Sequence, residues 1–150
     1  MKFANKVVMA VGSFDDILQQ FAQIKSMSFL DDCEIHFVHV FNTINYTALA
    51  GDFPVMYPVQ ADVKEIEKSV TSLLEFNAKK IIPDTFKGKM TFQCLFDQSS
   101  KRGFCDYVND HRFDLVIIPT RIKHDLFESS FAQFVNKHCQ SNMILLKNKK

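Results

Sequence analysis

The four cysteines are the residues of this sequence that could act as nucleophiles or bind a soft metal ion. They are Cys33, Cys94, Cys105 and Cys139, and no two of them have the short spacing of a zinc or redox motif. Cys94 lies in a strand-like run, and the last two lie in helix-like segments. We therefore predict buried, reduced thiols and no metal site.

The histidines could serve as metal ligands or as general bases. His36 and His39 are three residues apart in a strand-like segment, so their side chains should point to opposite faces. No HExxH motif occurs, and we expect both to be packed or rim histidines. The remaining three, His111, His124 and His138, stand alone and are expected at the surface or at helix ends.

Common motifs for phosphate binding and acyl transfer are absent, because the sequence contains no GxGxxG, GxxxxGK(S/T) or GxSxG. Asp15 and Asp16 are similar to the acidic pair of response-regulator receivers, in which Asp97 would be the phosphate acceptor. That interpretation needs a helix after the last strand, and none is predicted after Leu146. We expect the two aspartates to lie in the first turn of a helix capped by Ser13, and we predict no catalytic residues.

The order of apolar runs and helical patterns determines where any site can lie. Short apolar runs predict strands, which fall at 7–11, 34–41, 90–96, 114–118 and 143–146. Helical spacing predicts helices from Ser13 to about Met27, over 62–80, from Ser99 or Ser100 to His111, and around 127–138. This alternation predicts a single α/β domain over 1–150, with a five-stranded, mainly parallel sheet and helices on both faces. Ligands bind such sheets at the carboxyl ends of the strands. A long irregular loop is expected over 42–61 and a basic tail over 147–150.

Composition excludes several classes of protein. Apolar residues make up 47% and charged residues 23% of 150 residues, which is typical of a globular domain. Eighteen basic against 17 acidic side chains give a net charge of +1, too balanced for nucleic-acid binding. The apolar run near the start is too short for a signal peptide or a membrane span. We therefore expect a cytoplasmic protein that binds neither nucleic acid nor membrane.

Three blocks of the sequence resemble the universal stress protein family. Residues 113–121 match its D-L-I-V-V-G-(T/S) strand, 129–135 match the G-(S/T) start of its last helix, and 141–146 match its final P-V-L-V-V strand. The opening 7–13 is similar to V-A-V-D-G-S, and the second strand has the family's His39-Val40 pair. The resemblance implies the Rossmann-like fold of the adenine-nucleotide α-hydrolase group and a nucleotide site. That site would involve Gly12, Ser13, Val40, Thr120, Arg121, Ser129 and Ser130.

The glycines that shape the phosphate loop in ATP-binding members are replaced here. Pro119 and Ile122 stand at the two loop positions and Ser129 at the third, so a backbone donor and two flexible positions are lost. Asp125 and Glu128 add negative charge to the loop. Ser130 with Gln133 forms a capping box, which predicts a helix beginning at Ser130 with free N–H groups.

These departures predict a non-catalytic stress-response or regulatory binding protein that has no cofactor and does not bind ATP in the usual way. One alternative is a universal stress protein that binds ATP or AMP through a remodelled loop. Another is an enzyme of the wider adenine-nucleotide α-hydrolase superfamily, although its S-G-G-x-D-S and H-x-G-H motifs are missing. The resemblance implies a homodimer formed through the strand Met143 to Leu146, and a protein partner is a further expectation.

Overall fold

The computed structural model describes residues 4–11, 17–42, 60–82, 86–121 and 125–148. Within these ranges, strands alternate with helices along the chain, as predicted. The strands are β1 (Lys6–Ala10), β2 (Glu34–Asn42), β3 (Lys89–Asp97), β4 (Leu115–Arg121) and β5 (Asn142–Asn148). The helices are α1 (Ile17–Lys25), the 3-10 helix η1 (Ser28–Leu30), α3 (Gln60–Ile81), α4 (Ser100–His111) and α5 (Asp125–His138).

The strands form one sheet in the order β3-β2-β1-β4-β5, and every neighbouring pair is parallel. The predicted α/β class and parallel sheet are therefore confirmed. β1 lies at the centre of the sheet, where Met9 is level with Phe37 on one side and with Ile117 on the other. The strand order reverses between β1 and β4, which is where such sheets bind ligands.

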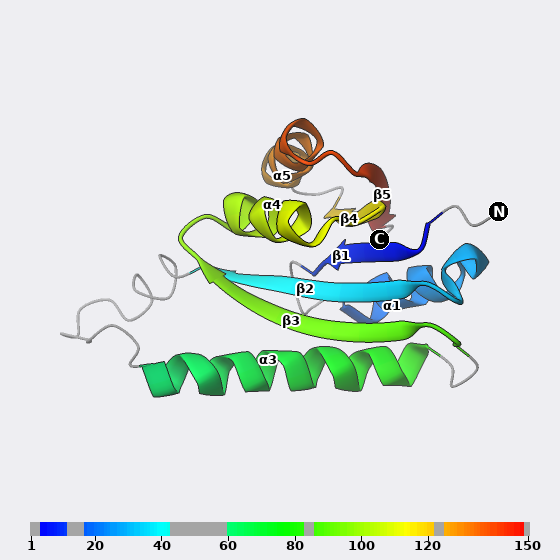
Figure 1. Cartoon of the computed structure of the whole chain (residues 1–150), viewed down its shortest axis with the longest axis horizontal. Coiled ribbons are helices and arrows are strands. Elements are labelled where there is room, and N and C mark those ends of the chain that lie inside the picture. Colours follow the sequence, from blue (N-terminus) through cyan, green and yellow to red (C-terminus); the bar gives the residue numbers. More distant parts are fainter. Residues whose placement is uncertain (1–3, 12–16, 43–59, 83–85, 122–124, 149–150) are drawn as a thin grey trace.

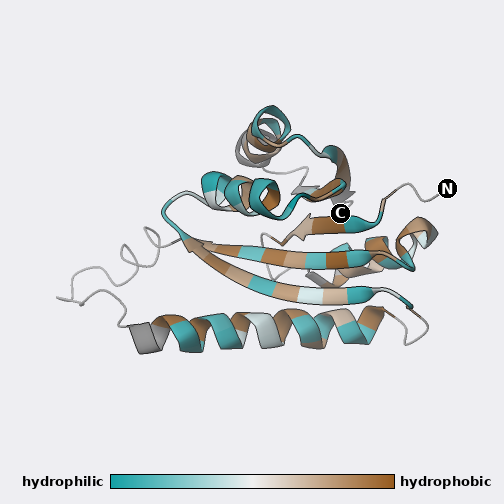
Figure 2. Cartoon of the chain, in the orientation of Figure 1, coloured by the Kyte–Doolittle hydropathy of each residue, from teal (hydrophilic) through white to brown (hydrophobic). Residues whose placement is uncertain are grey.

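Helices cover both faces of the sheet (Figure 1). One core contains apolar side chains of α1 and α3 with Val7 and Met9 of β1. The other contains side chains of α4 and α5 with Val8 and Ala10, because successive side chains of a strand point to opposite faces. Figure 2 shows β1 as mostly hydrophobic, whereas hydrophobic and hydrophilic residues are interleaved along α3. A strand covered on both faces needs a continuous hydrophobic pattern. A helix that covers the sheet with one face needs the interleaved pattern.

Boundaries near the end of the chain differ most clearly from the sequence-based expectations. β4 continues through Pro119 to Arg121, and β5 runs alongside it to Asn148. Lys147 and Asn148 are therefore strand residues, not part of a basic tail. α5 begins at Asp125, so the predicted helix start at Ser130 is wrong. The expected 42–61 loop lies mostly outside the described residues, although Asn42 ends β2 and α3 starts at residue 60.

None of the described helices is long and apolar enough to cross a membrane.

Candidate functional site

Three of the predicted site residues lie at the carboxyl edge of the sheet. Phe37 of β2 and Ile117 of β4 are both level with Met9 of β1. Val40 and Thr120 lie three residues beyond them, toward the carboxyl edge. Arg121 follows as the last residue of β4. Gly12 and Ser13 lie outside the described residues. The register thus places Val40, Thr120 and Arg121 on either side of the point where strand order reverses.

The last two predicted site residues, Ser129 and Ser130, lie inside α5 rather than at its start. The first free N–H groups of a helix are those of its first turn, which here begins at Asp125. The expected capping box of Ser130 with Gln133 therefore does not form the helix start. The first four residues of the helix include Asp125 and Glu128 instead, and acidic residue types are common at a helix start because of the helix dipole.

Backbone contacts fix the end of β1 at this edge. The N–H of Val11 donates to the carbonyl of Val38 at 2.8 Å. The imidazole Nδ1 of His39 lies 2.7 Å from the carbonyl oxygen of Val11 and donates to it. Burial lowers the pKa of His39, and this hydrogen bond partly opposes the effect. A neutral His39 thus acts as a structural brace for the residue that precedes Gly12.

The side chain of Asp97, at the end of β3, accepts a hydrogen bond at the start of α4. Its Oδ1 accepts from the N–H of Ser99 at 2.8 Å, and the Ser99 hydroxyl accepts from the N–H of Arg102 at 3.3 Å. Ser99, one of the two residues predicted to start this helix, is thus the N-cap of α4. A Cβ atom at Gly103 would lie 2.8 Å from Cβ of Asp97, so the glycine permits this close approach. These contacts explain Asp97 as a capping residue without a phosphate-acceptor role.

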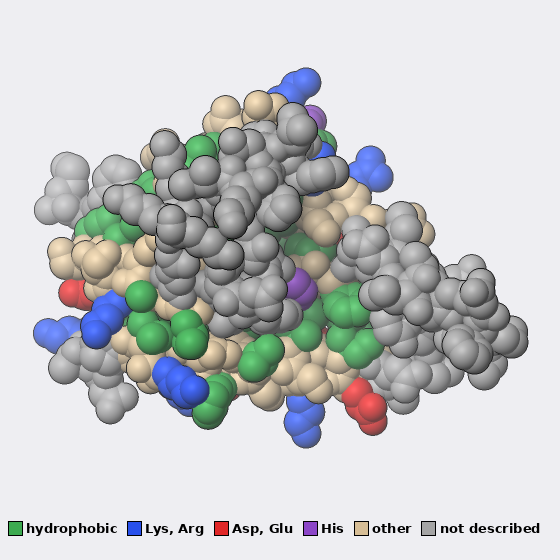
Figure 3. All heavy atoms as spheres, turned by 180° about the vertical axis from the view of Figure 1, so that it is seen from behind, with side chains coloured by type: hydrophobic (Ala, Val, Ile, Leu, Met, Phe, Trp, Pro, Cys, Tyr) green, Lys and Arg blue, Asp and Glu red, His purple; other side chains and the backbone are tan. Residues whose placement is uncertain are grey.

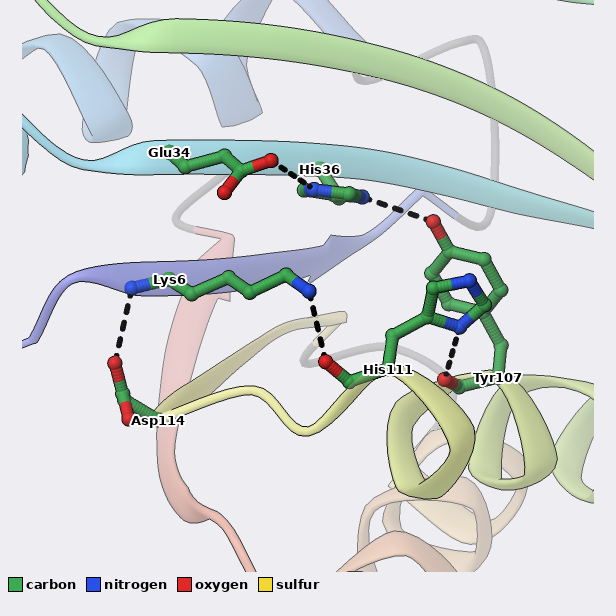
Figure 4. A network of polar contacts seen from close by, with 6 residues as sticks. All are labelled: Lys6, Glu34, His36, Tyr107, His111 and Asp114. Carbon is green, nitrogen blue, oxygen red and sulfur yellow. Dashed lines mark hydrogen bonds and ion pairs between the residues drawn. The ribbon is translucent and has the colours of Figure 1, made fainter.

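A polar network lies at the opposite edge, at the amino ends of the strands (Figure 4). His36 is at its centre and is 7% exposed. Its Nδ1 is 2.9 Å from the hydroxyl of Tyr107, and its Nε2 is 3.0 Å from Oε1 of Glu34. Its ring makes an edge-to-face contact with the ring of Phe113, with centroids 4.9 Å apart.

The protonation states in this network fit one another. Burial lowers the pKa of His36 and raises that of Tyr107, and the hydrogen bond with His36 lowers the pKa of Glu34. Near neutral pH the phenol therefore donates to Nδ1 of a neutral imidazole, whose Nε2–H donates to a carboxylate. Such a chain resembles a general-base relay, but its imidazole is buried and both of its nitrogens are occupied by protein groups. We interpret it as a tie between β2 and α4.

Lys6 and Asp114 strengthen the same edge. The Nζ of Lys6 donates to the carbonyl of His111 at 2.8 Å and lies 4.9 Å from the ring centroid of Phe113. Oδ2 of Asp114 accepts from the N–H groups of Asn5 and Lys6, both at 3.0 Å. The charged side chains at this edge therefore bind backbone groups of the protein itself. Sequence reasoning missed the network, although the alternate spacing of Glu34 and His36 places them on one face of the strand.

The network predicts that stability depends on pH. In the unfolded chain His36 is protonated near its ordinary pKa of 6.5. In the folded chain its pKa is lower, so it is protonated only at lower pH. The free energy of unfolding should therefore decrease as the pH falls from about 7 to about 5, and His36→Gln should flatten this decrease. Urea unfolding over a pH series measures this free energy. If it depends on pH in His36→Gln as it does in the wild type, His36 is not the group responsible. The control is His138→Gln, which changes an exposed histidine.

Metal-binding residues do not converge in the part of the chain that the structure describes, where no group of three potential ligands occurs. All four cysteines are reduced and buried, as predicted. Burial raises the pKa of Cys94 to about 11. A thiol in this state is a poor nucleophile and a poor metal ligand near neutral pH. His36 and His39 point to opposite faces of β2, also as predicted, since their partners are a side chain of α4 and the end of β1.

Comparisons with solved structures identify the architecture. No family model and no curated protein matches the sequence. The hypothetical protein PH0823 matches with a TM-score of 0.68 and 16% identity over 97% of each chain. UspA from Lactobacillus plantarum matches with a TM-score of 0.62 and 17% identity, over 95% of this chain and 97% of that one. A universal stress protein in complex with cAMP matches with a TM-score of 0.61 and 9% identity, over 97% and 98%. The chain therefore has the fold of universal stress proteins.

Proposed function

We propose that this protein is a universal stress protein-like, non-catalytic regulatory binding protein of the cytoplasm that does not hold ATP in the usual way. The observation that carries the proposal is Pro119, which stands in β4 opposite Leu146 at the position of the first loop glycine. Proline has no N–H to donate to a phosphate, and its ring fixes the backbone. A phosphate cradle needs both the donor and the freedom of glycine.

The start of α5 supports the same proposal. A helix N-terminus attracts phosphate through its free N–H groups and positive potential. Here Asp125 and Glu128 stand among the first four residues of α5, and acidic residue types at a helix start disfavour an anion there. The loss of the glycine and the acidic helix start act on the same phosphate, so restoring either one alone should not restore tight binding.

Nucleotide binding through a remodelled loop is the second candidate. One of the matched structures is a universal stress protein in complex with cAMP, a ligand with a single phosphate. A ligand of that kind needs fewer phosphate contacts than ATP does. The carboxyl edge of this sheet retains Thr120 and Arg121 at the end of β4.

The two candidates predict different responses to nucleotides. ATP at millimolar concentration should leave the melting temperature unchanged, because a ligand raises it only by binding the folded state. Protein purified from cells should release no stoichiometric ATP or ADP after denaturation. A melting temperature that rises with the concentration of ATP would contradict the proposal. A rise with cAMP or AMP but not with ATP would favour the second candidate.

We further propose that the protein forms a homodimer through β5. This strand lies at an edge of the sheet and, among the described strands, pairs only with β4. Its Leu145 is 48% exposed although it is apolar. Edge strands of this type are normally covered or paired, and a second copy can do both.

The surface of α3 is a second candidate interface, for a partner protein. Leu73 and Phe76 of α3 are exposed, at 42% and 59%. Figure 3, seen from behind, shows hydrophobic side chains at the surface in the lower part of the molecule, where α3 lies in Figure 1. Neighbouring exposed apolar side chains of this kind are typical of interaction surfaces.

A further inference from the structure

One side of α3 is exposed along most of its length. The helix lies along the outside of the molecule, next to β3 (Figure 1). Leu74 and Ala78 are fully buried in the core, so they mark the side that packs on the sheet. Beside them, helical geometry places six exposed residues within an arc of about 100°. These residues, which we call the α3 face, are Glu65, Ser69, Ser72, Leu73, Phe76 and Lys80.

The charged ends of the α3 face are symmetric about its middle. Glu65 precedes Ser72 by seven residues, and Lys80 follows Leu73 by seven. A twofold axis that crosses α3 between Ser72 and Leu73 brings a second copy of the helix antiparallel to the first. Glu65 of each copy then lies opposite Lys80 of the other, so opposite charges meet at both ends of the contact. In a parallel pair like charges would meet instead, and the helix dipoles would repel each other.

The side chains between these charged ends are complementary in size. Ser69 precedes Ser72 by three residues and Phe76 follows Leu73 by three, so the same axis places Phe76 of one copy opposite Ser69 of the other. The small serine leaves room for the phenyl ring, as packing of side chains between two helices requires. Leu73 of each copy lies next to the axis. The contact would therefore remove from water the two apolar side chains that α3 exposes, at 42% and 59%.

The other charges at the carboxyl end of α3 are compatible with this arrangement. Lys79 is paired with Glu75 within the helix, with 2.7 Å between Nζ and Oε1, so its charge is already balanced. The ammonium of Lys80 lies 4.5 Å from the ring centroid of Phe76. Lys80 is thus held over the apolar part of the α3 face, on the side where Glu65 of a second copy would arrive.

We propose that a second copy of this chain docks antiparallel on the α3 face. The proposal rests on the α3 interface proposed above and names a second copy as the protein that covers it. A single pair of helices buries less surface than the roughly 1,000 Å² of a stable interface, so we expect association only at about 0.1 mM protein and above. Because β5 is a separate contact, the two contacts together would join dimers into larger assemblies.

Sedimentation equilibrium of Leu145→Lys tests this contact in the absence of the β5 dimer. The variant should be monomeric at micromolar concentration and dimeric at several hundred micromolar, and about 0.5 M salt should weaken the association by screening the charges. A monomer at every concentration would overturn the proposal and leave the α3 face to a different protein. The wild-type chain distinguishes the two interfaces. A dimer that does not grow with concentration rejects only the α3 contact, whereas a micromolar monomer that dimerises at higher concentration rejects only the β5 dimer.

Charge substitutions in the Leu145→Lys background test the antiparallel register. Lys80→Glu should raise the dissociation constant at least about tenfold, because it places like charges opposite each other at both ends of the contact. Adding Glu65→Lys to Lys80→Glu exchanges the two charges and should restore the original constant. Lys64→Glu is the control, since it changes an exposed lysine on a different side of α3. An equal loss in this control, or no recovery in the double substitution, would overturn the proposal.

Discussion

Replacing Phe37 with alanine is expected to lower the free energy of unfolding by about 3–5 kcal/mol. Phe37 is fully buried in β2, in the core between the sheet and helices α1 and α3. Its ring makes an edge-to-face contact with Phe21, with centroids 4.9 Å apart, and it stacks on Phe92 at 5.5 Å. The substitution removes both ring contacts and leaves a cavity that joins three elements, which neighbouring side chains cannot fill without moving the strands.

Phe76→Ala is the matched control for that prediction, because it removes the same atoms from an exposed side chain of α3. The ring of Phe76 has the ammonium of Lys80 4.5 Å from its centroid, so the loss should be no more than about 1 kcal/mol. Urea unfolding followed by far-UV circular dichroism measures both variants. Similar losses in the two variants would mean that the Phe37 cluster does not form the core.

The fold could be predicted because strand and helix patterns here agree with tertiary burial. The continuous apolar run after Lys6 predicts a strand covered on both faces, and β1 is indeed central. The ends of the strands were less predictable, because each depends on how far the neighbouring strand extends. β5 extends past Leu146 to Asn148 only because β4 extends through Pro119 and offers it further backbone groups. A local apolar pattern contains no information about that partner.

The start of α5 shows how a good local signal can fail. Ser130 with Gln133 has the residue types of a capping box, yet Asp125 starts the helix. A helix may begin at any suitable residue before its amphipathic face, and the side chains that pack on the sheet decide how much of it forms. The sequence analysis predicted a start only at Ser130, and no local signal marked Asp125 as the first helical residue.

Contacts between distant residues were invisible for the same reason. His36 was predicted as a packed or rim histidine, and its burial confirms this. Its partner Tyr107 is 71 residues away, in α4. Only the packing of α4 against β2 brings the two side chains together. A single sequence predicts the face on which a residue lies better than the residue that it meets there.

Leu145→Lys is expected to raise the dissociation constant of the proposed homodimer by about 100-fold or more. The substitution places a charge on the edge strand β5, and a twofold interface would bring two such charges close together. Within the protomer the cost should be small, because Leu145 is already 48% exposed. Its neighbours Ile144 and Leu146 point to the opposite face and belong to the core, so the monomer should keep its fold.

Sedimentation at micromolar concentration separates the dimer proposal from its rivals. The wild-type chain should sediment as a dimer and Leu145→Lys as a folded monomer with the same circular dichroism. Leu73→Lys is the matched control, since it changes a leucine of similar exposure, 42%, on α3 instead of β5. A wild-type monomer would reject the dimer. A dimer broken by Leu73→Lys but kept by Leu145→Lys would move the interface to α3, because a buried lysine disrupts only the surface on which it lies.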